Sequence, residues 1–186
     1  MKKYELTAEF IEQWGKKLFR IKALISFGSV EAGELGGYVE KEDNLAQDGD
    51  AWVCDNARVC DNVMVYGNAR VYGNARVYGN ARVCGNARVY DNVMVYGDAR
   101  VYGDARVCGD ARVCDNADYL LIGRIGSRFS FTTFFKNKDK GITVSCGCFL
   151  GTIAEFRAKV TDTHGNNKHA KIYNLAADMA ELQILG

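Results

Sequence analysis

Between Gly49 and Cys114 the chain repeats a unit of six residues eleven times without insertion or deletion. The third and fifth positions of each unit are Ala or Val, whereas the fourth is Arg, Met or Trp and the sixth is Tyr or Cys. Alternation with a period of two places the small apolar residues on one face of a strand. The first two positions are Gly or Asp followed by Asn or Asp, which tolerate turn conformations. Each unit is therefore predicted to be a short strand followed by a corner.

Three such units close a triangular coil of eighteen residues, stacked on the next coil at the spacing of neighbouring strands. Residues 49–120, which include a degenerate twelfth unit, supply four coils and a rod of about 19 Å at ~4.8 Å per coil. Ala and Val fill a narrow interior, so each coil is stabilised mainly by the coils above and below it. An α-helix is excluded because Val at every sixth position makes no stripe at a period of 3.6 residues, and because Gly and Asn disfavour helices.

The segments on either side of the repeat are predicted to close its two ends, since an open end exposes unpaired backbone. Residues 1–30 are expected to form a cap: residues 17–25 alternate as a strand, and residues 7–14 are favoured as its hairpin partner over a short helix beginning at Thr7. Residues 31–48 are expected to form an irregular first coil. The solenoid then spans residues 31–120.

Residues 121–186 are predicted to form a small module of two strands followed by two helices. The apolar run 119–122 is expected to seal the coils, and strands at 128–135 and 142–148 make a hairpin. Thr152 and Glu155 form a capping-box pattern for a first helix that ends at Gly165. A second helix from about residue 168 to 182 shows an apolar stripe. The stripe consists of Ile172, Leu175, Ala176, Met179 and Leu182 or Gln183.

The repeat units, together with the segment Gly36-Gly37-Tyr38-Val39-Glu40 that precedes them, resemble those of the bacterial hexapeptide-repeat transferase superfamily. Within it, they look like uncharacterised acetyltransferase-like proteins of bacteria and prophages. The resemblance covers about two-thirds of the chain. It implies a mainly β fold, a left-handed parallel β-helix, and self-association into a homo-oligomer.

Acyl transfer is the activity that this resemblance implies first. Enzymes of the superfamily generally use a histidine base at a subunit junction and a loop that projects from the coils. Residues 49–120 contain no His and no insertion, and the two histidines of the chain, His164 and His169, lie outside the coils. A general base needs a pKa near neutrality at the reacting atom. We therefore assign no catalytic residue and favour a protein without enzyme activity, with an acyltransferase as the alternative.

Composition and the first residues of the chain indicate where in the cell the protein is expected. The 186 residues include no Pro and no apolar run near the ~18 residues that span a membrane. The beginning of the chain, MKKYELTAEF, has no signal-peptide core, so a cytoplasmic protein is expected. Five of the seven cysteines occupy the sixth position of a repeat unit. They lie either on different faces of the solenoid or above a Tyr or Leu of the next coil, so no two of them are placed to form a disulfide, and reduced thiols are predicted. These five are Cys54, Cys60, Cys84, Cys108 and Cys114.

Metal and cofactor binding are not expected. Cys146, Cys148, His164 and His169 are zinc-ligand types, but one residue separates the cysteines instead of two to four. Both cysteines lie an even number of positions after Ile142 and Val144, so on a strand they share one face with these apolar residues. They are therefore predicted to face the core of the module. We assign no metal ligand and no cofactor.

Charge argues against nucleic acid as the partner of the coils. Residues 49–120 hold eight Arg and nine Asp, a net charge of −1, and neutralisation of phosphates dominates nucleic-acid binding. Residues 121–186 carry a net charge of +4 and contain one candidate basic patch. Its members are Arg124, Arg128, Lys136, Lys138 and Lys140.

The outward residues of the coils form columns at a period of eighteen. One column is Trp52, Arg70, Arg88 and Arg106, with Tyr72 and Tyr90 beside it, and the second face carries Arg58, Arg76, Met94 and Arg112 with Tyr78 and Tyr96. Corner residues such as Asp98, Asp104 and Asp110 are expected to compensate these arginines. Tyr and Arg are enriched at interface hot spots, and a rigid surface loses little entropy on docking. The leading hypothesis is a non-catalytic scaffold that engages a macromolecular partner. The resemblance narrows it to a prophage-encoded inhibitor or decoy of a bacterial host factor, and binding of a small anion or nucleotide at a subunit junction is the other alternative.

Overall fold

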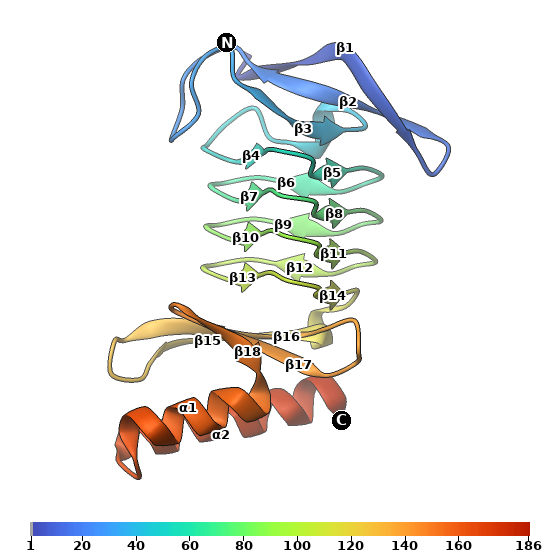
Figure 1. The fold of residues 1–186 in the computed structure, drawn as a ribbon. Helices are drawn as coiled ribbons and strands as arrows, with labels where there is room; N and C mark the ends of the chain where they lie inside the picture. Colours follow the sequence, from blue (N-terminus) through green and yellow to red (C-terminus); the bar gives the residue numbers. More distant parts are fainter. Residues whose placement is uncertain (1) are drawn as a thin grey trace.

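The computed structural model describes residues 2–186, which form a stack of coils closed at one end by a β-sheet extension and at the other by a sheet with two helices (Figure 1). Three parallel sheets make the walls of the stack. We name them the first face (β4, β7, β10, β13), the second face (β5, β8, β11, β14) and the third face (β6, β9, β12). The strands are β4 Trp52–Val53, β5 Arg58–Val59, β6 Met64–Val65, β7 Arg70–Val71, β8 Arg76–Val77, β9 Arg82–Val83, β10 Arg88–Val89, β11 Met94–Val95, β12 Arg100–Val101, β13 Arg106–Val107 and β14 Arg112–Val113.

Strand register confirms the predicted coil of eighteen residues. Val59 pairs with Val77, and Val77 with Val95, so each step to the next coil advances the chain by one full turn. The third-position Ala or Val and the fifth-position Val of every unit are at most 1 % exposed. They join in one continuous core that runs along the axis. The chain is therefore a β-solenoid. Its core is long and narrow, because each strand contributes only two small side chains to it.

The corners explain the choice of residues at the first two positions of the unit. The first position always has a left-handed backbone, with φ between 57° and 77° for both the Gly and the Asp residues. Glycine also permits close stacking, since a Cβ on Gly79 would lie 2.9 Å from the backbone nitrogen of Gly97 in the next coil. At the second position Asn side chains bond from coil to coil, as from Asn62 to Asn80 at 3.0 Å and from Asn80 to Asp98 at 3.0 Å.

The N-terminal cap is the predicted hairpin, and it continues the second face. Strands β1 (Tyr4–Gln13) and β2 (Lys16–Ala23) pair antiparallel, β2 pairs with β3 (Leu35–Val39), and β3 lies parallel to β5. After the short helix η1 (Glu42–Asn44), Leu45 bridges to Val65, which completes a first coil. Trp52 has the register expected of the first column but is fully buried, because Tyr4 and Phe27 pack edge-on against its ring at 6.1 and 5.4 Å.

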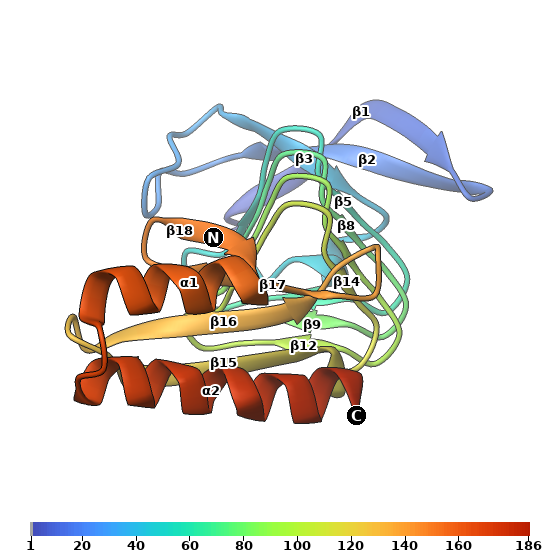
Figure 2. The same cartoon turned by 60° about the horizontal axis from the view of Figure 1, so that its bottom comes forward.

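The C-terminal module has four strands, two more than predicted. After η2 (Asn116–Asp118), β15 (Tyr119–Ile125), β16 (Ser130–Lys136), β17 (Ile142–Cys146) and β18 (Phe149–Thr152) form one antiparallel sheet in that order. The helices α1 (Ile153–His164) and α2 (Lys168–Leu185) cover the side of this sheet that faces away from the coils (Figure 2). The predicted capping box at Thr152 and the end of α1 at Gly165 are confirmed. The apolar run 119–122 seals the coils as part of β15, a strand paired along its length with β16.

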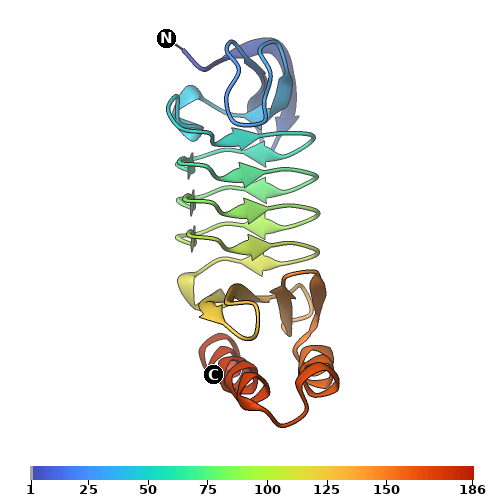
Figure 3. The ribbon, with the colours of Figure 1, turned by 90° about the vertical axis from the view of Figure 1, so that its left-hand side faces the viewer.

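Strand β16 belongs to two cores at once. Phe135 is fully buried in the core of the solenoid, whereas its neighbour Phe134 is fully buried in the core under the helices. Figure 3 shows this sheet as a layer between the last coil and the helices. The backbone nitrogen of Arg106 also donates to Thr133 Oγ1 at 3.1 Å, and Ala111 bridges to Asn137. The last coil is therefore closed by direct hydrogen bonds to the module.

The stripe predicted for α2 is wrong in its orientation. The buried residues are mostly small: Ala170, Tyr173, Ala176, Ala177, Ala180 and Ile184. Ile172, Leu175, Met179 and Leu182 are exposed, with Leu182 at 77 %. Alanines let the helix approach the sheet closely, and Tyr173 then fills the gap by packing edge-on against Phe156 at 5.6 Å.

All seven cysteines are free. Cys60 and Cys108 are buried although they point outward, Cys60 because Leu18 and Tyr38 of the cap cover it. Cys146 faces the core as predicted, but Cys148 is exposed, because β17 ends at Cys146 and Gly147 turns the chain with a φ of 63°. Within residues 2–186, neither α1 nor α2 has the length and apolar character needed to cross a bilayer.

Candidate functional site

The first face brings Arg70, Arg88 and Arg106 into one column, with each arginine paired in register to the next. Inward-pointing Val71, Val89 and Val107 fix the opposite orientation of the arginines. Tyr72 and Tyr90 stack beside them with ring centroids 4.9 Å apart and planes 4° apart. Trp52 is buried at one end of this face, and the C-terminal sheet abuts the other. The exposed part of the column is therefore short.

The corner carboxylates that are expected to compensate these arginines form no ion pair with them. Asp98 and Asp104 accept hydrogen bonds from Asn80 and Asn86, each at 3.0 Å, and Asp110 pairs with Lys138 at 2.7 Å. Among residues 2–186, none of the eight arginines of the coils forms an ion pair. Like charges that face each other on neighbouring strands repel. The columns thus present guanidinium groups without ion-pair partners among the described residues.

The second face carries an aromatic ladder that extends beyond the coils. Tyr78 and Tyr96 stack at 5.1 Å with planes 7° apart, and Trp14 lies 5.0 Å from Tyr78. Trp14 stands at the turn between β1 and β2, has a left-handed φ of 53° and is 52 % exposed. The hairpin therefore extends past the edge of the coils and presents an indole to their surface.

A cavity of about 360 Å³ lies beneath this indole. We call it the hairpin groove, and it is lined by Trp14, Lys16, Cys60, Asp61, Arg76, Tyr78 and Met94. Arg76 and Arg112 belong to the same column and have no carboxylate partner in the described chain, whereas Arg58 donates to Gln13 of the hairpin. The groove thus combines an aromatic wall, a flexible Met and the guanidinium group of Arg76, with that of Arg112 further along the same column.

Lys16 holds the hairpin to the coils. Its ammonium pairs with Glu40 at 3.1 Å and with Asp61, and the Lys16 hydrogen bond lowers the pKa of Asp61. Within residues 2–186, Glu40, Cys60 and Asp61 are the single group of three potential metal ligands close enough to share an ion. The lysine ammonium already bridges both carboxylates, so the residues fit an ion-pair cluster better than a metal centre. Cys146, Cys148, His164 and His169 do not form such a group.

The five residues of the predicted basic patch do not form one surface. Lys136 pairs with Asp118 at 3.0 Å and Lys138 with Asp110 at 2.7 Å, where both attach the module to the last coil. Lys140 lies in the exposed turn between β16 and β17. Arg124 and Arg128 line two different cavities.

The first of these, the junction cavity, lies between the first face and the C-terminal sheet and has a volume of about 450 Å³. Arg88 and Arg106 enter it from the coils and Arg124 from β15. The remaining lining residues are Asn86, Asp104, Phe129, Ser130, Phe131, Thr133, Ser145 and Gly147. Arginines from both predicted sets, the column and the patch, thus meet at one place.

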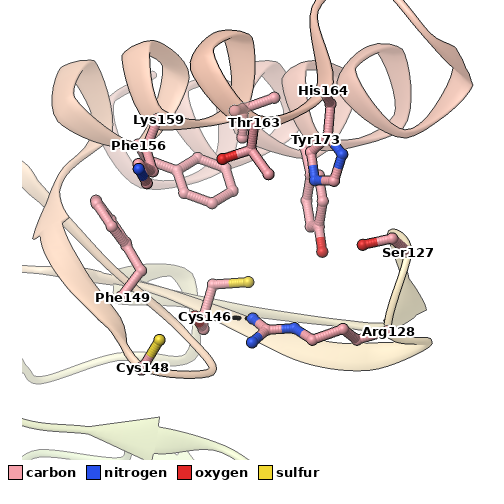
Figure 4. Close-up of a pocket in the computed structure, with 11 residues that line it drawn as sticks. Ser127, Arg128, Cys146, Cys148, Phe149, Phe156, Lys159, Thr163, His164 and Tyr173 are labelled. Atoms are coloured by element: carbon pink, nitrogen blue, oxygen red, sulfur yellow. Dashed lines mark hydrogen bonds between the residues drawn. The ribbon is translucent and has the colours of Figure 1, made fainter.

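The second cavity lies between the sheet and α1 and has a volume of about 280 Å³ (Figure 4). Phe149, Phe156 and Val160 give it an apolar wall, and Tyr173 and His164 stack at 5.8 Å on the other side. Arg128 reaches across Gly147, where any Cβ would clash with the guanidinium, and donates to the Cys146 carbonyl at 3.4 Å. Burial raises the pKa of Tyr173, with the nearby Cys146 as a second cause. The cavity suits a small apolar group.

Sequence reasoning missed Trp14 and Phe129, the two most prominent aromatic residues of these sites. Both are large residues in turns with a left-handed backbone, with φ of 53° and 47°. A bulky aromatic residue rarely adopts this conformation. The signal available in the sequence was an aromatic residue next to a turn residue, Trp14-Gly15, at the tip of a predicted hairpin.

The fold and these surfaces define the chain as a β-solenoid protein. Comparison with protein families agrees on the fold: a family profile described as the YdcK beta solenoid repeat matches residues 57–73, 69–85, 81–97, 87–103 and 94–109. These windows all lie within the coils. No curated protein matches the chain.

Proposed function

We propose that this β-solenoid is a binding protein that engages an acidic protein partner through its second face. The proposal rests on the hairpin groove, which contains Trp14, Tyr78 and Arg76, together with the adjoining second face, where Tyr96 continues the aromatic ladder and Arg112 continues the arginine column. Trp, Tyr and Arg are the residues that most often carry interface energy, and Met is enriched with them.

The groove is suited to a partner with both apolar and acidic side chains. Trp14 is half exposed and Met94 partly exposed, so both offer apolar area for burial. Two guanidinium groups without ion-pair partners in the described structure attract carboxylates, and such complementarity raises the association rate and selects partners. The coils beneath are rigid because each is hydrogen-bonded to its neighbours along its whole length. Docking on such a surface orders few groups.

The sequence resemblance supports a narrower form of the same proposal. In this form the chain is a homo-oligomer of the hexapeptide-repeat superfamily and acts in the cytoplasm as a prophage-encoded inhibitor or decoy of a bacterial host factor. The second face is open in the single chain, so partner binding does not depend on self-association. Light scattering of the purified protein would establish the oligomeric state.

A matched pair of methionines provides a site-specific test. The unit DNVMVY occurs twice, and it places Met94 on the second face and Met64, 47 % exposed, on the third. We expect a photo-crosslinking amino acid at position 94 to trap one defined partner in cells and the same residue at position 64 to trap none of it. Equal trapping from both positions, or trapping from position 64 alone, would contradict the assignment of the second face.

Charge reversal tests the role of the arginines. We expect R76E/R112E to reduce the affinity for the trapped partner at least tenfold, since each residue loses a charge-assisted contact and gains repulsion. The control R82E/R100E makes the same change on the third face and is expected to leave affinity unchanged. Circular dichroism verifies that both variants fold. An equal loss of affinity in both would show that the change in net charge, and not the position of the arginines on the second face, weakens binding.

A further inference from the structure

The junction cavity is a second, independent site. It lies on the first face, where the C-terminal sheet meets the coils, whereas the hairpin groove lies on the second face, and the two share no lining residue. Its arginines come from segments far apart in the sequence, Arg88 and Arg106 from neighbouring coils and Arg124 from β15. The docking of β16 against the last coil holds these segments together.

The arginines of the cavity have no ion-pair partner in the described chain, and their charge is compensated only in part. Neither an ion pair nor a side-chain hydrogen bond within residues 2–186 involves the guanidinium of Arg88, Arg106 or Arg124. The one carboxylate in the lining, that of Asp104, accepts a hydrogen bond from Asn86 at 3.0 Å. By contrast Lys136 and Lys138, on the same module, both have carboxylate partners. Three cations against one anion leave a net charge of +2 in a confined space.

Hydroxyl groups add neutral donors to this charge. Thr133 is 2 % exposed and Ser145 is 6 % exposed, yet both line the cavity. Thr133 Oγ1 accepts from the backbone nitrogen of Arg106, so its own hydroxyl hydrogen is free to point into the cavity. Guanidinium groups with hydroxyl donors around them match the geometry and charge of a phosphate, which carries about −1.5 to −2 at neutral pH.

An aromatic residue stands at the opening. Phe129 is 71 % exposed in a left-handed backbone conformation, and Phe131 lies beside it in the lining. Phe131 packs directly on Gly123, where a Cβ would lie 2.1 Å from the ring. An exposed ring next to a phosphate site provides a stacking surface for a planar base. The volume of about 450 Å³ is in the range of small-molecule sites.

From these features we infer that the junction cavity binds a small phosphate-bearing ligand of the nucleotide class. Arg88, Arg106 and Arg124 hold the phosphate, Thr133 and Ser145 donate to its oxygens, and Phe129 stacks on the base. The site is formed within one chain, whereas the sequence alone suggested a subunit junction for an anion.

Calorimetric titration of the full chain tests this inference. The probes are inorganic phosphate, tripolyphosphate, the four common ribonucleoside monophosphates and the matching unphosphorylated nucleosides. At least one phosphorylated probe is expected to bind, with affinity that falls as salt rises, and the nucleosides are expected not to bind. Absence of binding by all phosphorylated probes at millimolar concentration would overturn the inference.

Matched variants identify the site. R88Q/R106Q and R124Q are each expected to weaken phosphate binding at least tenfold, whereas R70Q, in the same column but outside the cavity, and R128Q, in the other cavity, are expected to bind as the unmodified protein does. F129S is expected to weaken nucleotide binding and to leave tripolyphosphate binding unchanged. Equal affinity of R88Q/R106Q and R70Q would refute the site, and an F129S variant with full nucleotide affinity would refute the nucleotide class. Neither result bears on the second face, which is tested with a protein partner.

Discussion

At the scale of the residue, the cysteines show how burial controls chemistry on an outward-facing position. Burial under the cap raises the pKa of the Cys60 thiol from 9.0 to about 12, with Asp61 as the next cause, and burial raises that of Cys54 to about 11. Cys148, in contrast, is exposed in the turn between β17 and β18. The same residue type is therefore expected to behave differently at these three positions.

The first prediction concerns alkylation. We expect iodoacetamide at pH 8 to modify Cys148 rapidly and to leave Cys60 and Cys108 unmodified in the native protein, since access and thiolate formation are both required. Mass spectrometry of the digested protein measures each site. A protein unfolded in urea serves as the control in which all cysteines react, and rapid native modification of Cys60 would contradict its burial under the cap.

The second prediction concerns stability above pH 9. Because the folded-state pKa values of Cys54 and Cys60 are raised, folded thiols keep protons that unfolded thiols lose, so their contribution to stability is complete below pH 9 and declines as pH rises toward 11 or 12. Urea unfolding between pH 8 and pH 10 should show a falling free energy of unfolding. The slope should be smaller in C54A/C60A, and an equal slope would assign the pH dependence to other groups.

At the scale of the element, the hexads were predictable from sequence and the second helix was not. In a strand with the sequence Ala-Arg-Val-Tyr, only one orientation buries the small residues, and the same pattern recurs in all eleven units. Helix α2 is apolar on two sides, and large residues outweigh alanines in any hydrophobicity count. The side that packs is decided by how closely β15 and β16 allow the helix to approach, which sequence periodicity does not encode.

The third prediction tests this orientation of α2. Leu182→Gln and Met179→Gln replace exposed side chains and are expected to change the free energy of unfolding by less than about 0.5 kcal/mol. Ala177→Leu and Ala180→Leu overfill fully buried positions and are expected to cost about 1 to 3 kcal/mol. Urea denaturation of the four variants measures both effects, and a large loss from L182Q with none from A177L would restore the stripe predicted from sequence.

The candidate sites were predictable in their parts and not in their assembly. Spacing alone placed Arg88 and Arg106 in one column and Tyr78 with Tyr96 in another. The contributions of Arg124 and Trp14 depend on how the flanking modules dock, which involves contacts between segments distant in sequence. The basic patch failed for the same reason, because Lys136 and Lys138 find carboxylates in the last coil.

At the scale of the whole molecule, β16 joins two cores that would otherwise be separate. Phe134 and Phe135 are neighbours in sequence, yet one is buried under the helices and the other in the solenoid. Coils that are each stabilised by their neighbours already unfold cooperatively over short arrays. The shared strand extends this coupling to the helices.

The fourth prediction is therefore a single unfolding transition. Tryptophan fluorescence reports on Trp14 and Trp52 at the N-terminal end, and circular dichroism at 222 nm reports largely on α1 and α2 at the other. The two midpoints in urea should coincide, and F135A should lower both together by an equivalent of about 3 to 5 kcal/mol. Separate midpoints, or a loss confined to one probe, would show that the module unfolds independently.

The period of eighteen residues also makes the distance between the two candidate sites adjustable. Trp14 of the groove is tied to the first coils and Arg124 of the cavity to the last, so inserting or deleting one whole coil would move these two residues apart or together by ~4.8 Å without changing the faces beside which they lie. Inserting or deleting a single unit of six would instead turn one site by a third of a revolution relative to the other. The distance between the two ends and the angle between them are thus set separately by the same repeat, and a gene that duplicates or loses short tracts can vary either one.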